Sequence, residues 1–537
     1  MLPGLPPLVL LETVTADDDD NVTIPASGTI AGHANFPAGS KHVVVGYNAQ
    51  TTYAGDEGYA LVQVNGDTGS NYDMQRLDGF GSSVAAYKET GIIGWSQIAM
   101  MGAGDSHPSP GFIMVPNAFA TTGYLAMIGS SSGYVERSRF GAGTWRSTAA
   151  LTSMNFVAPE TGNGTGITGT FSLYVVDESY LVSGGEEVLT GTSAFTNRSV
   201  PSQVGDISII NYMRSARSAT NDGIALDINT DTTATNYNNQ ALQAYATTAY
   251  AAVNQYDNNQ IGGCNAATAD SNYFSGALTT VNAFNYGDND PHAICLSGHI
   301  SVSAADGWAS LYNTQRNNVA AVTSVNVSPT VSSTFLAGSG QWVYAVPKVL
   351  LERKTLTDAT TTSVTFTLSG LTIPDNVKHL RLNVYGRGDE ASVYDWVSMA
   401  INSDTTAANY DNQELYGGYW GSTPGASQSA ASRRIGTIGS ANATANVFGG
   451  FTALLPDYAS TSIRKHYISI GGVPAQISNL LSGSWENTAA IATITLTLEQ
   501  GDDFVAGTIL ELEGIGDLGG WSGTFNGVDN PGKVNGI

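Results

Sequence analysis

The sequence has little cysteine, little basic charge and few charged residues of any kind. Only Cys264 and Cys295 occur among 537 residues, too few for a disulfide framework. We expect two buried or unpaired thiols, and a bond joining them is the alternative. The 45 acidic side chains outnumber the 21 basic ones, and the net charge of -24 would repel phosphate backbones and anionic lipid surfaces. We therefore expect no nucleic-acid binding.

Long apolar segments are absent as well. No run approaches the roughly 20 residues that a bilayer span needs, and the first residues lack the basic and apolar regions of a signal peptide. There is also no long heptad stretch that would trimerise the chain as a coiled coil. These absences predict no membrane insertion, synthesis in the cytoplasm without a signal peptide, and oligomers that form through sandwich faces, strand edges or terminal arms.

Catalytic motifs are missing too. The sequence has no H-E-x-x-H, no glycine-rich phosphate loop before a helix, and no G-x-S-x-G elbow between a strand and a helix. The seven histidines are scattered singly, as surface or satisfied core residues usually are. We predict a non-enzymatic protein without a cofactor. A carboxylate pair that cleaves polysaccharide stays open, because sequence does not show the spatial separation of such a pair.

What the sequence does have is a β-rich, turn-rich composition dominated by Gly, Ala, Ser, Thr and Asn, with 9% aromatic residues. Several segments alternate apolar and polar residues with period two. Residues 380–385 read Leu-Arg-Leu-Asn-Val-Tyr, and in residues 493–498 threonines alternate with Ile494, Leu496 and Leu498. Such alternation predicts antiparallel sheets with one face buried.

One segment recurs three times, starting at Asn65, Asn229 and Asn402. Each copy reads approximately N-x-D-T-x-x-N-Y, and the spacing between copies is that of a complete β-sandwich domain. Other landmarks recur around it in the same order. They are V-L-L-E at residues 9–12 and 349–352, a tryptophan segment at 145–151 and 485–491 with a weaker counterpart at 317–322, and the turns Gly169-Thr170, Gly338-Ser339 and Gly507-Thr508.

The repeat predicts an all-β chain of three tandem antiparallel β-sandwich modules of jelly-roll type, each with about eight strands. We place these modules at residues 1–181, 182–346 and 347–515. A glycine-rich C-terminal arm, residues 516–537, follows them.

The V-L-L-E opening, the N-x-D-T-x-x-N-Y segment and the W-R-S-T-A-A segment resemble a module found in structural proteins of tailed bacteriophages. The resemblance spans most of the chain and is weakest in module 2. It implies a virion-surface location on tail or head, and a binding or scaffolding role with no catalytic residues to carry over.

From this resemblance we expect a surface appendage, such as a tail fibre or a receptor-binding component for host attachment. The alternative is a capsid decoration protein or head fibre whose three modules cover a symmetry axis as a pseudo-trimer within one chain. A carbohydrate-binding lectin and a polysaccharide depolymerase are further alternatives. The expected partners are other virion proteins, further copies of the chain, most often as trimers in fibres, and a host glycan or receptor.

The recurring Asn-Asp-Thr segment has two interpretations. Its oxygen-rich side chains Asn65, Asp67, Asn71 and Asp73 could supply calcium ligands. The same residue types are also what a tight turn needs for its backbone geometry and local hydrogen bonds. Because no EF-hand spacing is present, the turn is the leading interpretation and we expect no bound metal.

Aromatic residues supply the remaining candidates. We expect Trp145 and Trp485 to be core residues between the sheets. Exposed aromatics in loops could hold a glycan or a partner protein, or seal one module against the next. The candidates for these contacts are Tyr416, Tyr419 and Trp420 in module 3, with Trp521 and Phe525 anchoring the C-terminal arm.

Overall fold

In a computed structural model, the chain folds almost entirely as β-strands. The structure describes residues 6–529 apart from 53–57, 81, 104–108, 134–136, 159–165, 202–205, 257–258, 270–271, 283–290, 301–306, 318–319, 347–348, 359, 376, 419–423, 444–446, 463, 475, 502, 517–523 and 526–527. The helices in this part of the chain are single 3-10 turns. They are η1 (Ile30–Gly32), η2 (Glu178–Tyr180), η3 (Ala234–Asn236), η4 (Leu368–Gly370) and η5 (Ala407–Asn409).

Module 1 consists of twelve strands. They are β1 (Leu8–Asp19), β2 (Asn21–Ile24), β3 (Val43–Thr51), β4 (Gly58–Val64), β5 (Tyr72–Phe80), β6 (Ser83–Ile92), β7 (Trp95–Ala103), β8 (Ser109–Val115), β9 (Leu125–Gly133), β10 (Arg137–Trp145), β11 (Met154–Val157) and β12 (Ile167–Val176).

Modules 2 and 3 repeat this series. Module 2 has β13 (Leu181–Val188), β14 (Arg198–Ser199), β15 (Asp206–Met213), β16 (Asn221–Ile228), β17 (Tyr237–Tyr245), β18 (Thr248–Tyr256), β19 (Gln260–Asn265), β20 (Ser275–Asn282), β21 (His292–Ile300), β22 (Gly307–Arg316), β23 (Ser324–Pro329) and β24 (Gly340–Val346). Module 3 has β25 (Val349–Thr355), β26 (Ser363–Thr367), β27 (Val377–Gly386), β28 (Tyr394–Ile401), β29 (Tyr410–Gly418), β30 (Gly425–Ala430), β31 (Arg434–Gly439), β32 (Gly449–Leu455), β33 (Lys465–Val473), β34 (Ile477–Trp485), β35 (Thr493–Leu498) and β36 (Ile509–Gly516).

All three modules share one topology, which confirms the prediction of tandem β-sandwiches. In module 3 an eight-stranded sheet, β25-β36-β27-β32-β33-β34-β29-β30, packs on a four-stranded sheet, β26-β35-β28-β31. Modules 2 and 1 have the same order in their own strand numbers, with β7 of module 1 also joined to β3 by a short parallel pairing. Each sandwich therefore has twelve strands rather than the eight that we expected.

Each sandwich has its own apolar core between its two sheets. Strand β35 shows how the sequence builds it, because Ile494, Leu496 and Leu498 point into the module 3 core while the intervening threonines lie half-buried on the outer side. The predicted core role of the tryptophans is confirmed, since Trp145 and Trp485 are almost fully buried in the cores of modules 1 and 3.

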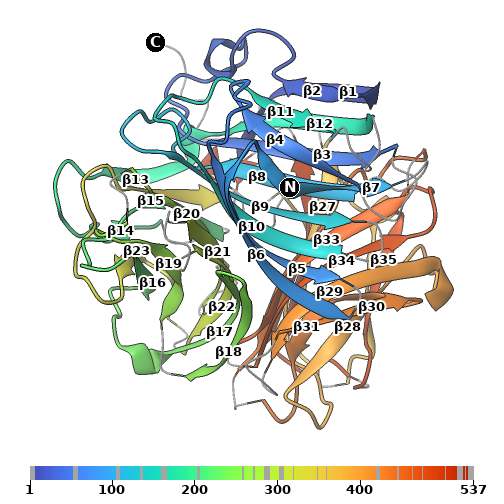
Figure 1. The fold of residues 1–537 in the computed structure, drawn as a ribbon. Coiled ribbons are helices and arrows are strands. Elements are labelled where there is room, and N and C mark those ends of the chain that lie inside the picture. Colours follow the sequence, from blue (N-terminus) through green and yellow to red (C-terminus); the bar gives the residue numbers. More distant parts are fainter. Residues whose placement is uncertain are drawn as a thin grey trace.

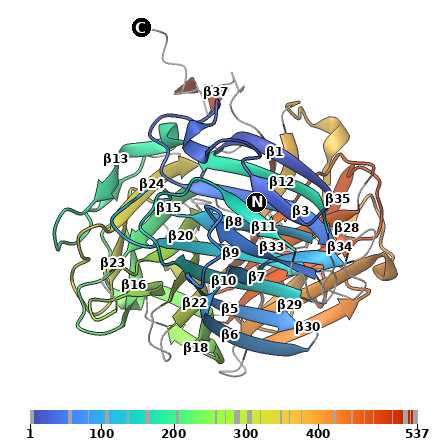
Figure 2. The same ribbon diagram turned by 45° about the horizontal axis from the view of Figure 1, so that its top comes forward.

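A fourth apolar core joins the modules to one another, and we call it the central core. The outer faces of the three eight-stranded sheets turn toward it, with Leu77 and Phe140 from module 1, Leu242 from module 2, and Leu415 and Leu480 from module 3. Figure 1 shows module 1 in blue to teal, module 2 in green to yellow and module 3 in orange to red, each beside the other two, and Figure 2 shows the same grouping from another side. The chain is thus a closed pseudo-trimer of homologous sandwiches.

Two details differ from the sequence-based expectations. Gly338-Ser339 and Gly507-Thr508 directly precede β24 and β36, and both glycines have a positive φ, whereas Gly169 lies inside β12 and marks no turn before the last strand. The polar residues Arg381 and Asn383 of β27 face away from the module 3 core, but both are buried rather than exposed, and Arg381 meets Asp206 of module 2. Gly516, placed in the arm from the sequence, is the last residue of β36, and the rest of the arm contributes the short strands β37 (Thr524–Phe525) and β38 (Val528–Asp529) to the described structure.

Candidate functional site

The recurring Asn-Asp-Thr segment is a tight turn that leads into β5 and is held by its own side chains. Asp67 Oδ1 accepts a hydrogen bond from the Gly69 amide at 2.8 Å, and Oδ2 accepts from Asn71 Nδ2 at 2.9 Å and from Trp145 Nε1 at 2.7 Å. Tyr72 Oη donates to the Asp67 carbonyl at 2.8 Å. Burial alone would raise the pKa of Asp67, but the donated hydrogen bonds outweigh it and hold this pKa below its ordinary value.

The oxygens of the other calcium candidates Asn65 and Asp73 also accept hydrogen bonds from protein groups. Asn65 Oδ1 accepts from the Thr152 amide at 2.7 Å, Asp73 Oδ1 accepts from the Gly91 amide at 2.9 Å, and Asp73 Oδ2 accepts from Tyr273 Oη at 2.7 Å. Each of these oxygens faces an N–H or O–H donor, which is the environment of a structural turn and not of a cation. Among the residues whose positions are described, no group of three or more His, Cys, Asp or Glu is placed to hold a metal.

The turn is reproduced in module 3, where Asp404 Oδ2 accepts from Asn409 Nδ2 at 2.8 Å and from Trp485 Nε1 at 2.9 Å. In module 2 the tryptophan is replaced by Arg316, whose Nε donates to Asp231 Oδ2 at 3.1 Å. The strand register identifies the replacement, since Arg316 pairs with Tyr237 as Trp145 pairs with Tyr72. This equivalence of Arg316 and tryptophan cannot be recognised from the sequence, because guanidinium and indole share only an N–H donor at the end of a long side chain.

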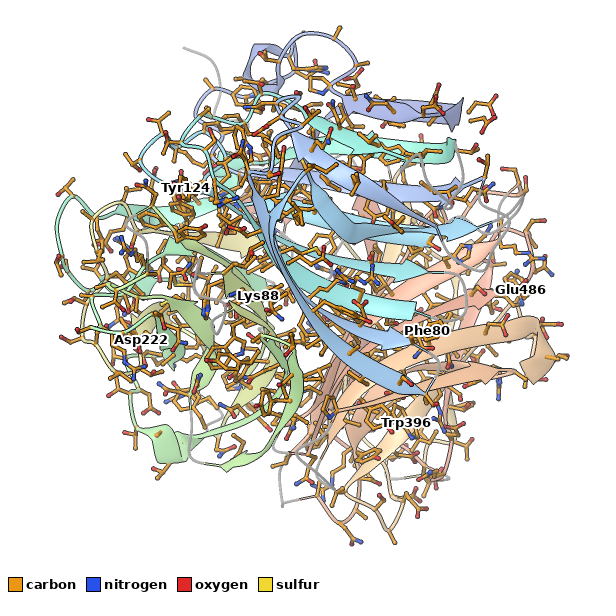
Figure 3. The ribbon with its side chains drawn as sticks, viewed as in Figure 1. Phe80, Lys88, Tyr124, Asp222, Trp396 and Glu486 are labelled. Carbon is orange, nitrogen blue, oxygen red and sulfur yellow. The ribbon has the colours of Figure 1, made fainter. Side chains whose placement is uncertain are left out.

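The predicted aromatic contacts are only partly described. Tyr416 is half-buried on β29 and packs in a small cluster with Tyr394 and Trp396, so it contributes to the interior of module 3. Figure 3 shows Trp396 within that module. Tyr419, Trp420 and Trp521 lie outside the described residues, and of Phe525 only the backbone in β37 is described.

The surface where module 1 meets module 2, here the 1/2 seam, is built mainly from aromatic rings. His42 packs edge-on against Trp342, with ring centroids 4.6 Å apart. Tyr212 stacks on Phe274 and donates to the carbonyl oxygen of Tyr124 across the seam at 2.8 Å. Tyr124 lies at this boundary in Figure 3. Burial lowers the pKa of His42 to about 3, so its ring is neutral near pH 7.

The homologous 2/3 seam is built from buried charges. Asp206 occupies the position of His42 and lies 3.5 Å from Arg381 Nη2. Glu513 also pairs with Arg381 and accepts from Asn383 Nδ2 at 2.9 Å. Asp206, Arg381 and Glu513 are all almost fully buried. Buried charges need such partners, because desolvation of an isolated ion is very costly.

Around the central core, one hydrogen bond recurs between neighbouring modules. Ser138 Oγ of β10 donates to the Gln413 carbonyl of module 3 at 3.0 Å, and the equivalent Ser478 Oγ of β34 donates to the Gln240 carbonyl of module 2 at 2.8 Å. Module 2 has Ala309 at this position. At Gly298 an added Cβ would lie 2.2 Å from Ala142 Cβ across the 1/2 seam, so only glycine fits. At these positions the backbones and side chains of neighbouring modules are therefore in direct contact.

The two cysteines are buried and unpaired, as we predicted. Burial raises the pKa of Cys295 to about 12 and raises that of Cys264 further, so neither thiol is a ready nucleophile at neutral pH. The described part of the chain contains no helix long and apolar enough to cross a membrane.

Comparisons with known proteins give little similarity. No protein-family model matches the chain, and no curated protein matches it in sequence. Among solved structures, galectin LEC-6 of Caenorhabditis elegans is 9% identical, with a TM-score of 0.13 over 30% of this chain and 95% of its own. Sheep galectin-11 is 8% identical, with a TM-score of 0.12 over 28% of this chain and 97% of its own. A protein of unknown function from Shewanella oneidensis is 8% identical, with a TM-score of 0.12 over 31% of this chain and 75% of its own.

Proposed function

We propose that the chain is a non-enzymatic structural protein on the surface of a tailed-phage particle. The observation that carries the proposal is the closure of three homologous sandwiches around one central core. Modules of an extended fibre would be joined end to end, with little apolar surface buried between them. A closed block with approximate threefold symmetry instead suits a position where three like surfaces of a shell meet.

This geometry favours the head-surface alternative, a capsid decoration protein or the base of a head fibre. Both the 1/2 seam and the 2/3 seam are buried and specific, so one chain supplies a rigid threefold unit without assembling three subunits. The chemistry of the described residues is consistent with a scaffold, since the recurring Asp side chains are engaged in turns and both thiols are buried. The partners would be other virion proteins. Because the net charge is -24, these partners include basic shell surfaces that attract an acidic protein.

A tail-associated receptor-binding component is the second candidate. A compact block could form the knob at the end of a fibre, with the loops between strands available for contacts to a host glycan or receptor. The number of copies in the particle separates the two positions. A decoration protein occurs in tens to hundreds of copies, whereas a tail component occurs in few.

The experiment is quantitative mass spectrometry of purified phage particles from a lysate that contains this gene, combined with antibody labelling under the electron microscope. High copy number with labelling over the head is the expected result. Low copy number with labelling confined to the tail would keep the virion role and move the protein to the second position. Particles that lack the chain would overturn the proposal.

A further inference from the structure

The third seam, between modules 3 and 1, contains a partly open cavity of about 740 Å³. One wall comes from β1, β3, β8 and β12 of module 1. The other comes from module 3, with Lys378 and His379 of β27 and with Pro456, Asp457, Ser460, Ser462, Arg464 and Thr488. His379 of module 3 occupies the same register position as His42 and Asp206 in the other seams. The 3/1 seam is therefore homologous to the other two, where His42 packs on a ring and Asp206 faces a buried cation.

The cavity follows directly from the sequence of module 1. Its outer face carries small or short residues where the register places large ones in module 2: Gly46 for Ile210, Asn48 for Tyr212, and Ser172 for Trp342. Module 3 also fills these positions, with Asn383, Tyr385 and Glu511. An added Cβ at Gly46 would lie 3.8 Å from the Tyr174 ring, an ordinary contact, so packing does not require glycine there.

The lining is rich in groups that both donate and accept hydrogen bonds. Thr13 Oγ1 and Ser172 Oγ lie 3.1 Å apart on the module 1 wall, beside Thr168 and Thr170. Asn48 Oδ1 is buried and accepts no hydrogen bond from the described residues. Such an acceptor is costly to leave without a donor.

The module 3 wall adds two cations, an anion and a neutral imidazole. Lys378, Arg464 and Asp457 line the cavity. Arg464 is paired with Glu486. His379 Nδ1 accepts from the Asp457 amide at 3.0 Å, and burial lowers the pKa of His379 to about 3. The neutral ring therefore carries its proton on Nε2 and can act as a donor. Opposite charges on this wall make it polar without favouring ligands of one sign.

A second hollow of about 320 Å³ adjoins the cavity and shares Lys378, Asp457 and Ser460 with it. Its other lining residues include Ile373, Pro374 and Tyr458 of module 3. The two hollows are therefore neighbours that share one stretch of wall.

We infer that the 3/1 seam is a binding site for a short oligosaccharide. Its volume lies in the range of about 300–1,000 Å³ typical of ligand sites. Hydroxyl and amide groups exchange hydrogen bonds with sugar hydroxyls, and the Tyr174 ring in the lining offers an apolar surface for a sugar ring. This inference is independent of the proposed virion role, because binding of a sugar at the 3/1 seam requires only the folded chain and no other virion protein.

The test uses the purified full-length chain and three probes, namely maltotriose, chitotriose and trigalacturonic acid. Binding is measured by isothermal titration calorimetry and by saturation-transfer NMR. Gly46→Ile installs the side chain that module 2 has at this position. The matched control is Gly191→Ile, because Gly191 lies in an exposed loop with open space around it.

We expect at least one probe to bind, with affinity at least tenfold weaker in Gly46→Ile and unchanged in Gly191→Ile. Ser172→Ala removes one hydroxyl without adding volume and should weaken binding severalfold. This variant tests the inference even if Gly46→Ile does not fold. Failure of all three probes to bind at millimolar concentration would overturn the inference. Binding that all three variants retain would also overturn it, because the sugar would then bind elsewhere.

Discussion

The 1/2 seam and the 2/3 seam occupy homologous positions and are stabilised by opposite chemistry. His42 meets Trp342 and Tyr344 in the first, while Asp206 meets Arg381 and Glu513 in the second. In a homotrimer all three interfaces would be identical. A single chain can make each interface different, and a buried ion cluster that matches only one neighbour helps to fix the order of the modules around the axis.

The largest effect should come from Arg381→Ala in the 2/3 seam. The substitution leaves the buried carboxylates Asp206 and Glu513 without their shared cation, and breaking a buried pair costs about 3–5 kcal/mol. We expect a loss at the upper end of this range, measured by urea unfolding. Lys354→Ala, which breaks the partly exposed Lys354–Glu352 pair in the same module, is the control and should cost less than about 1 kcal/mol. Equal losses in both variants would show that the buried cluster is not structural.

Trp342→Ala should have a somewhat smaller effect on the 1/2 seam. Truncation of a fully buried tryptophan removes a large apolar area and leaves a cavity, with an expected cost of about 3 kcal/mol. This loss should be almost independent of salt concentration, because the seam is mainly aromatic. Tyr250→Ala, at an exposed aromatic residue of module 2, should be nearly neutral. A strong salt dependence of the Trp342→Ala effect would contradict the contrast between the seams.

A pH effect should separate the seams further. Burial raises the pKa of Glu178, next to the 1/2 seam, to about 7, although hydrogen bonds from Tyr344 Oη and the Lys41 amide oppose the shift. The folded state therefore retains a proton that the unfolded chain loses above about pH 4.5, so this group lowers stability as pH rises from about 4.5 to 7.

Glu178→Gln should remove that dependence and gain about 1–2 kcal/mol at pH 8, a value already reduced for solvent screening of a partly exposed group. The measurement is the free energy of unfolding of both proteins from pH 4.5 to 8. A constant difference between the two curves across this range would argue against the raised pKa.

The smallest effect concerns the hydrogen bonds around the central core. Ser138→Ala removes a donor to the Gln413 carbonyl, with an expected cost of about 1 kcal/mol. The converse change, Ala309→Ser, would supply module 2 with the hydroxyl that the other two modules have, and we expect it to be neutral or slightly stabilising. Thermal unfolding of both variants is the measurement. A destabilisation by Ala309→Ser larger than that by Ser138→Ala would mean that the third position is not equivalent.

The fold class could be predicted because local signals agree along the chain. The alternation in residues 493–498 predicted that Ile494 and Leu496 lie on one face of a sheet. The Asn-Asp-Thr turn marked the equivalent position in each of the three modules. The closure of the three modules around a central core could not be predicted. Alternation distinguishes the two faces of a strand, but it does not show what covers the face that points away from the module's own core. Arg381 looked like a solvent-facing residue and is buried in a seam. The cavity in the 3/1 seam could not be predicted either. Gly46 and Ser172 are recognised as unusually small only when the structure aligns them with Ile210 and Trp342 of module 2.

Small-angle X-ray scattering of the purified monomer tests most directly whether the three modules close into one body. A compact chain of this length should have a radius of gyration of about 24 Å, whereas three such modules in a row would give roughly 35 Å. We predict the smaller value, unchanged between low and moderate salt. A value near the larger one would contradict the closed pseudo-trimer, and with it the seams and the function proposed from them.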